Sequence, residues 1–243
     1  MSDLTELLKA SFQYQIHEIY TALPCVVVSV ANIKEQRIDV QPLLNNIRPD
    51  GTDVPHPVIL GVPIMFPATS TSALTFEVST GDSVLCVFTQ RCSDSFKAGN
   101  GTVSRPIDLR IFDKRDACAL LGLFPFSKAI NNPKKRTWEH DVKDTVLVHN
   151  IGTANEVEIR FKKSGDLVIN TNKNVTVNCQ EAEVNATTTT INGDLVVNGD
   201  IDSTGTVTAT TDVFGGGKSL KTHLHAGPAT APSGPVVPTG API

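Results

Sequence analysis

Aromatic side chains are scarce in this sequence, and the few that it has are unevenly placed. They make up 5% of the 243 residues, and only Phe161 and Phe214 follow Trp138. The part of the chain after Trp138 has too few large rings for an ordinary globular core, which favours a repetitive β structure. Apolar runs are also short, since none reaches the roughly 18 residues that a transmembrane helix needs. A membrane-spanning helix is therefore excluded.

Cysteine spacing gives no sign of a disulfide framework or of a CxxC motif. The cysteines are odd in number and scattered, so we expect reduced, mostly buried thiols in a protein made in a cytoplasm. Residues 1–6 lack the basic region and apolar core of a secretory signal, which agrees with this expectation. The five are Cys25, Cys86, Cys92, Cys118 and Cys179.

Positive charge and catalytic motifs are missing as well. The formal net charge is −4, which implies no general attraction to nucleic acid, and no nucleic-acid partner is expected. The sequence has no GxSxG or HExxH motif, and no pair of carboxylates lies in the aromatic setting typical of sugar cleavage. We therefore expect no enzymatic activity, and a polysaccharide depolymerase is disfavoured.

The first half of the chain predicts one helix followed by a small barrel. Apolar residues recur at helical spacing in residues 3–20, within an N-terminal helical segment of residues 1–22. Residues 23–122 then carry about five strand-like runs separated by loops, which is typical of a small closed or partly closed barrel such as an OB-fold. Residues 123–155, with prolines and a basic cluster, are expected to form a connector.

Residues 156–217 have the pattern of short alternating strands. Val157, Ile159 and Phe161 alternate with charged residues, and similar strands recur every six to nine residues between turn signals such as Asn192-Gly193-Asp194. Each strand has so few apolar residues that one chain cannot bury them against itself. Three chains wound about a common axis would hide these residues and pair every strand edge. The pattern predicts an intertwined trimeric β-helix or β-prism, and a single-chain β-solenoid is the alternative.

The charges along this rod predict a distinct tip. Residues 174–217 contain six acidic residues and no lysine or arginine, and after Lys221 only histidines and the terminal carboxylate can carry charge. An uncharged end costs least to push into an apolar layer. The predicted apex comprises residues 218–243.

The apex contains the pair His223 and His225. In an extended strand, residues two apart point to the same side, so the pair would aim both imidazoles at one place. One pair holds a metal poorly, but a parallel trimer would supply six nitrogens around one point. Such an octahedral site suits Fe(II), Ni(II), Co(II) or Zn(II), and it would be structural because no position remains open.

The order of these segments resembles a known family. The Gly81–Leu85 run leading to Arg91 is similar to that family's N-terminal barrel, and the Ser219–His225 segment with the Pro238–Pro242 ending is the specific part of the match. Together with the helix and the acidic rod, these features resemble the membrane-puncturing central spikes of contractile-tail bacteriophage baseplates, typified by the gp138 protein of phage phi92. The resemblance covers nearly the whole chain.

The resemblance implies a homotrimer of OB-fold domains carrying a needle-like β-helix, with one iron ion held at its apex by His223 and His225 of each chain. It implies a structural virion protein of the tail baseplate, made in the host cytoplasm, that pierces the host outer membrane when the tail sheath contracts. Baseplate hub or tail tube proteins are the expected partners at the N-terminal end, and the host outer membrane at the C-terminal tip. Residues 226–243 are expected to wrap the apex. Ordinary structural or surface roles are expected for His17, His56, His140 and His149.

A second class of function stays open. A receptor-binding fibre tip or host-surface adhesin can also use a metal-stabilised trimeric β-rod with an HxH site. Such a tip would need a recognition surface rich in aromatic residues, and the C-terminal half has few of them.

Overall fold

The computed structural model describes residues 2–17, 19–48 and 50–223 of the chain. The chain divides between Thr176 and Val177 into two compact units, which are described separately. Within the described residues strands outnumber helices, so the prediction of a mostly β protein is confirmed. In the same residues, no helix has both the length and the apolar character needed to cross a membrane.

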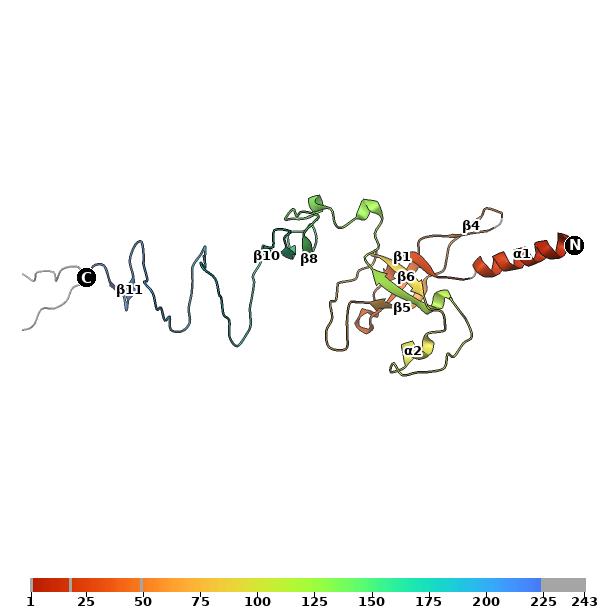
Figure 1. Ribbon diagram of the computed structural model, residues 1–243, viewed down its shortest axis with the longest axis horizontal. Helices are drawn as coiled ribbons and strands as arrows, with labels where there is room; N and C mark the ends of the chain where they lie inside the picture. Colours follow the sequence, from red (N-terminus) through yellow and green to blue (C-terminus); the bar gives the residue numbers. More distant parts are fainter. Residues whose placement is uncertain (1, 18, 49, 224–243) are drawn as a thin grey trace, which may run out of the picture. The chain divides into compact units, whose positions relative to one another are not determined.

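The first element is a helix, α1 (Ser2–His17; red in Figure 1), which covers most of the stretch where sequence periodicity predicts one. Its apolar side chains are not buried: Leu4, Leu7 and Phe12 are 64%, 67% and 65% exposed. Most helical stability in proteins comes from packing of an apolar face, and a helix of this length is marginal alone. These side chains would therefore stabilise α1 only when another surface covers them.

Five strands form the barrel that the sequence predicts. They are β1 (Ala22–Ser29), β2 (Arg37–Pro42), β5 (Ile59–Met65), β6 (Ser83–Phe88) and β7 (Ala117–Leu121). Their order is β1-β2-β5-β7-β6, and the barrel closes because β6 pairs with β1. All neighbours are antiparallel except β5 and β7, which are parallel. This is the strand order of an OB-fold, and closure leaves the barrel without free edges.

Alternation along these strands produces the barrel core. Ile38 and Val40 of β2 and Val84 and Cys86 of β6 are at most 1% exposed, and the residues between them face outward. The core therefore depends mainly on aliphatic side chains, as the low aromatic content requires. All five cysteines are free; three are buried, Cys118 is half-buried and Cys179 is exposed.

Short elements occupy the connections. Between strands of the barrel lie η1 (Ile33–Glu35), β3 (Asn46–Ile47), β4 (Asp53–Val54), α2 (Asp94–Ala98) and η2 (Lys114–Asp116), and after the barrel come η3 (Phe126–Lys128) and η4 (Pro133–Lys135). β3 and β4 pair as a hairpin. The β6–β7 connection, which contains α2 and η2, is the longest in the barrel.

A three-stranded antiparallel sheet follows the barrel within the first unit. It consists of β8 (Thr145–His149), β9 (Val157–Phe161) and β10 (Leu167–Thr171), in the order β10-β9-β8. β8 lies within residues 123–155, where we expected only a connector. The alternating strand expected at Val157–Phe161 forms, but it pairs with strands of its own chain.

One face of this sheet carries charged residues and is covered by the chain. Glu158 and Arg160 are 1% and 7% exposed. Arg160 donates to the carbonyl oxygens of Glu139 and Trp138 at 3.0 and 2.9 Å and to Glu158 Oε1 at 2.5 Å. Asn170 of β10 donates to the same Glu158 oxygen at 2.8 Å. The backbone before β8 thus lies over this face and accepts two hydrogen bonds from Arg160, while Glu158 Oε2 and Arg160 Nε have no hydrogen-bond partner in the described chain.

The opposite face of the sheet is apolar and exposed. Its side chains share this face because Leu147, Ile159 and Ile169 are paired across the three strands, as are Phe161 and Leu167. Apart from the half-buried Ile159, these large apolar residues are between 44% and 59% exposed. The inward face therefore combines Glu158 and Arg160 with the half-buried Val146, Val148 and Val168, whereas the outward face leaves its large apolar side chains exposed.

Residues 172–213 form neither helix nor strand within one chain. Residues 172–211 are all exposed, and no backbone–backbone hydrogen bond of the described chain involves residues 172–212. Bends recur at residues 193, 199, 205 and 211, six residues apart. The trimeric β-helix expected over residues 156–217 is thus not a structure that one chain forms by itself.

A short hairpin ends the described part of the second unit. β11 (Phe214–Gly215) pairs with β12 (Lys218–Ser219), which leaves Gly216 and Gly217 as a two-residue loop. Their φ values are +58° and +78°, as a type I′ turn requires, and glycine adopts these angles without strain.

Candidate functional site

The predicted metal ligand His223 lies directly after this hairpin. Its backbone N–H donates to the carbonyl oxygen of Ser219 at 3.0 Å, and its Nδ1 lies 2.9 Å from the carbonyl oxygen of Leu220. A carbonyl oxygen only accepts, so Nδ1 is the donor of this contact. Metal-bound histidines usually donate their other ring N–H in this way, so His223 fits such a role. The second predicted ligand, His225, lies outside the described residues, and the geometry of the pair stays a prediction.

The other described histidine side chains lie in the first unit. His56 is 5% exposed and packs edge-on against Tyr20, with 5.7 Å between the ring centroids. His140 is equally buried, and its Nε2 lies 3.3 Å from Asn131 Oδ1. His149 is exposed on β8. Among the described residues, no metal-like cluster includes any of them.

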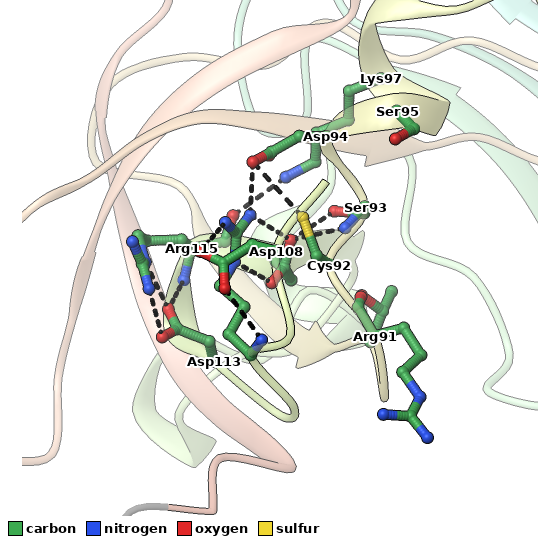
Figure 2. Close-up of polar contacts among 12 residues, drawn as sticks. Arg91, Cys92, Ser93, Asp94, Ser95, Lys97, Asp108, Asp113 and Arg115 are labelled. Carbon is green, nitrogen blue, oxygen red and sulfur yellow. Dashed lines mark hydrogen bonds and ion pairs between the residues drawn. The ribbon is translucent and has the colours of Figure 1, made fainter. Parts of the chain in front are cut away.

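One group in the described part of the chain does have the spacing of a metal site. Cys92, Asp94 and Asp116 each place a ligand atom within 4.8 Å of the others, and all belong to the β6–β7 connection. Figure 2 labels Cys92 and Asp94 of this group. A cation already lies there, however. The guanidinium of Arg110 donates to Asp94 Oδ2 at 2.6 Å and to both oxygens of Asp116, at 2.6 and 2.9 Å. A metal ion would have to displace this guanidinium, so the group does not fit a metal site.

The Arg110 network fastens the two ends of the β6–β7 connection together. Arg110 also pairs with Asp108 at 3.2 Å, and Ser93 donates its N–H and its hydroxyl to Asp116 Oδ1, both at 2.8 Å. Burial alone would raise the pKa of Asp116, but hydrogen bonds from Arg110 and Ser93 outweigh it and hold that pKa below its usual range. Hydrogen bonding by Arg110 likewise lowers the pKa of Asp94. Both carboxylates are therefore ionised at neutral pH.

Sequence reasoning missed this network. The pattern singles out Arg91 near the end of β6, but the residue that organises the connection is Arg110, whose partners Asp116 and Asp94 are 6 and 16 residues away. The only sequence signal is a dense alternation of charge over residues 108–116, which by itself is typical of a solvated loop.

A cleft of about 630 Å³ opens on the barrel beside this network. It is lined by residues of η1, β2, β5 and α2. Glu35 of η1 and Arg37 of β2 contribute charged side chains to the cleft, and so do Asp94 and Lys97 of α2. Because α2 belongs to the β6–β7 connection, the segment that Arg110 holds in place forms part of the cleft wall.

The closed barrel has the strand order of an OB-fold, and comparison with known proteins shows which family this segment resembles. Residues 23–122 match the family model of the phage protein Gp138 N-terminal domain. Over this segment the match agrees with the resemblance inferred from the sequence, and the domain it resembles is that of a phage protein. No curated protein matches the chain.

Proposed function

We propose that the protein is the central spike of a contractile-tail phage baseplate and pierces the outer membrane of a Gram-negative host when the tail sheath contracts. The Gp138 domain over residues 23–122 supports a phage structural role. The tail would supply the force, and the spike would supply stiffness and a sharp tip.

The observation that carries this proposal is the unpaired apolar repeat after the sheet. Leu195, Ile201, Val207 and Val213 follow one another at six-residue intervals, the same period as the bends. Within one chain they are 65%, 73%, 73% and 41% exposed. Burying such a side chain is worth about 1.5–3 kcal/mol, so the exposed series favours association. Three intertwined chains would turn each residue of the series toward a common axis and pair the free backbone edges.

The apolar face of the β8–β9–β10 sheet supports the same assembly. Its charged face is already covered by the chain, so only the apolar face is left for contact with other copies. Three such faces around one axis would form a closed core, whereas a single exposed one would promote aggregation. A homotrimer is therefore the assembly that accounts for both the sheet and the repeat.

The C-terminal end supports a piercing tip. The acidic rod avoids nucleic acid, and the segment after Lys221 has no charged side chain other than histidine. His223 and His225 of three chains would hold one metal ion through six imidazoles, iron by the family resemblance. A bound ion of this kind would fix three chain ends that otherwise fray.

The N-terminal end is the proposed attachment site. Baseplate hub or tail tube proteins would bind the barrel and α1, whose leucines are exposed. Docking would cover the apolar side of α1 and so stabilise a helix that is marginal alone.

The test is native mass spectrometry combined with elemental analysis of the full chain. We expect a trimer with one transition-metal ion per three chains, and loss of the ion in the double variant His223→Ala/His225→Ala. Lys221→Ala is the control, because it changes the neighbouring residue without removing an imidazole. A monomer would contradict both the proposed trimeric rod and the proposed metal site at its tip.

Phage carrying the same double variant separate the spike from the alternative. Loss of infectivity with normal adsorption to the host is the outcome expected for a spike. Loss of adsorption would favour a receptor-binding fibre tip or adhesin instead.

A further inference from the structure

The cleft beside the Arg110 network lies on the ligand-binding face of an OB-fold. In barrel order, β2 and β5 are the second and third strands, η1 lies in the connection between the first two strands, and α2 lies in that between the fourth and fifth. These strands and loops are the surfaces with which OB-folds bind oligonucleotides and oligosaccharides. The volume of about 630 Å³ is within the usual range for ligand sites.

The charged side chains of the cleft are balanced and held in place. Glu35 and Arg37 form an ion pair from η1 and β2, and Asp94 and Lys97 project from α2. Asp94 Oδ2 accepts a hydrogen bond from Arg110 at 2.6 Å, and Lys97 Nζ donates to the carbonyl oxygen of Arg115 at 3.0 Å. The four lining charges sum to zero. A polyphosphate chain needs a positively charged surface, so this cleft does not suit nucleic acid.

An aromatic ring and an open patch of backbone complete the cleft. Phe96 of α2 is 70% exposed although it belongs to a connection that Arg110 fastens. Gly61 of β5 has φ +63°, and a Cβ placed there would meet nothing within 4 Å. The cleft therefore offers an exposed ring together with one strand position that has no side chain and open space above it. Sugar rings stack their C–H faces on aromatic rings, and their hydroxyls use carboxylates and cationic donors together.

We infer that this cleft binds a neutral oligosaccharide. All residues of the cleft lie in the barrel domain, so glycan binding there does not depend on the proposed trimeric rod or on the proposed metal site at the tip. A neutral glycan could come from the cell-wall glycan strand or from the surface polysaccharide of the host, and the two sources can be distinguished with soluble probes.

The experiment is saturation-transfer NMR on the assembled full-length protein. The probes are chitohexaose, which represents the glycan strand, and O-polysaccharide released from lipopolysaccharide. We expect transfer to at least one probe, and which one responds identifies the source. Phe96→Ala should raise the Kd about tenfold, the loss expected for one stacking contact. Phe126→Ala is the matched control, because Phe126 is 101% exposed on η3, away from the cleft.

Three results would overturn the inference. One is no transfer to either probe, and another is an equal loss of binding in Phe96→Ala and Phe126→Ala. The third is stronger protection of residues 94–98 from hydrogen exchange in the glycan-free trimer than in a monomeric variant, which would mean that a neighbouring copy fills the cleft. Circular dichroism of both variants excludes loss of folding as the cause.

Discussion

The Arg110 network allows a sharp test of how the barrel is held together. Replacing Arg110 with methionine keeps a long side chain but removes the charge and every hydrogen bond that the guanidinium makes. Asp116, which is fully buried, would then keep only the two hydrogen bonds from Ser93. A buried carboxylate would be left without its counter-charge.

The expected cost follows from the burial of the pair. Removing one partner of a buried ion pair costs about 3–5 kcal/mol. We expect the lower value, about 3 kcal/mol, because the Arg110 side chain is 10% exposed and Ser93 continues to donate. Arg115→Met is the matched control, since Arg115 pairs with Asp113 at 2.9 Å but its side chain is 62% exposed. Exposed pairs contribute only about 0–1 kcal/mol.

Hydrogen exchange read by mass spectrometry measures this difference within the barrel itself. Exchange of amides in β6 and β7 reports the free energy of opening, so about 3 kcal/mol corresponds to roughly 100-fold faster exchange in Arg110→Met. Arg115→Met should exchange within about fivefold of the unchanged protein. If both variants exchange equally fast, the guanidinium does not compensate the buried charge of Asp116, and the reasoning is refuted.

Two further predictions concern pH and the repeat. The pKa values of Asp116 and Asp94 are lower in the folded barrel than in the unfolded chain, so the unfolded chain takes up more protons in acid, and stability is complete above about pH 4 and decreases as the pH falls further. Urea unfolding at pH 7 and pH 3 should therefore show a lower midpoint at pH 3, and an unchanged midpoint would contradict the assignment. In the rod, Ile201→Asp should abolish the trimer in native mass spectrometry, whereas Val196→Asp, outside the six-residue series, should keep it. The same outcome for both variants would contradict the proposal that the six-residue apolar series forms the trimer contact.

Local sequence patterns were sufficient to predict the strands of the barrel but not how they join. Period-two alternation identifies Ile38 and Val40 as inward-facing because the side chains of a strand alternate between its faces. Closure depends instead on pairs that are distant in sequence, such as Ile64 of β5 with Ala119 of β7. The number of strand-like runs suggested an OB-fold, and only the three-dimensional pairing gives the order of its strands.

Charged residues were expected to face solvent, but at two sites, the Glu158–Arg160 pair and Arg110, they are buried or nearly so. Glu158 and Arg160 alternate with apolar residues, a pattern that normally marks a solvent-exposed face, but residues 138–139 cover them with backbone carbonyl groups. Arg110 likewise lies in a charge-rich loop, yet it is mostly buried between its partners Asp94 in α2 and Asp116 in η2. In neither case do neighbouring residues reveal which distant segment will cover the charge. The pair His223 and His225 stays a prediction, because the sequence makes it informative only together with a trimeric rod and His225 lies outside the described residues.

The extended repeat has a consequence for the order of assembly. Residues 172–212 make no backbone–backbone hydrogen bonds within the described chain, so rigidity there would arise mainly when copies meet. Three associated barrels would hold the three extended segments at an effective concentration in the millimolar range, which removes the need for a diffusional search. The segments would then zip from the barrel toward the C-terminus, and the histidines would meet last. Metal uptake would accordingly report that a spike is complete, and a partly assembled one would be neither stiff nor closed at its tip.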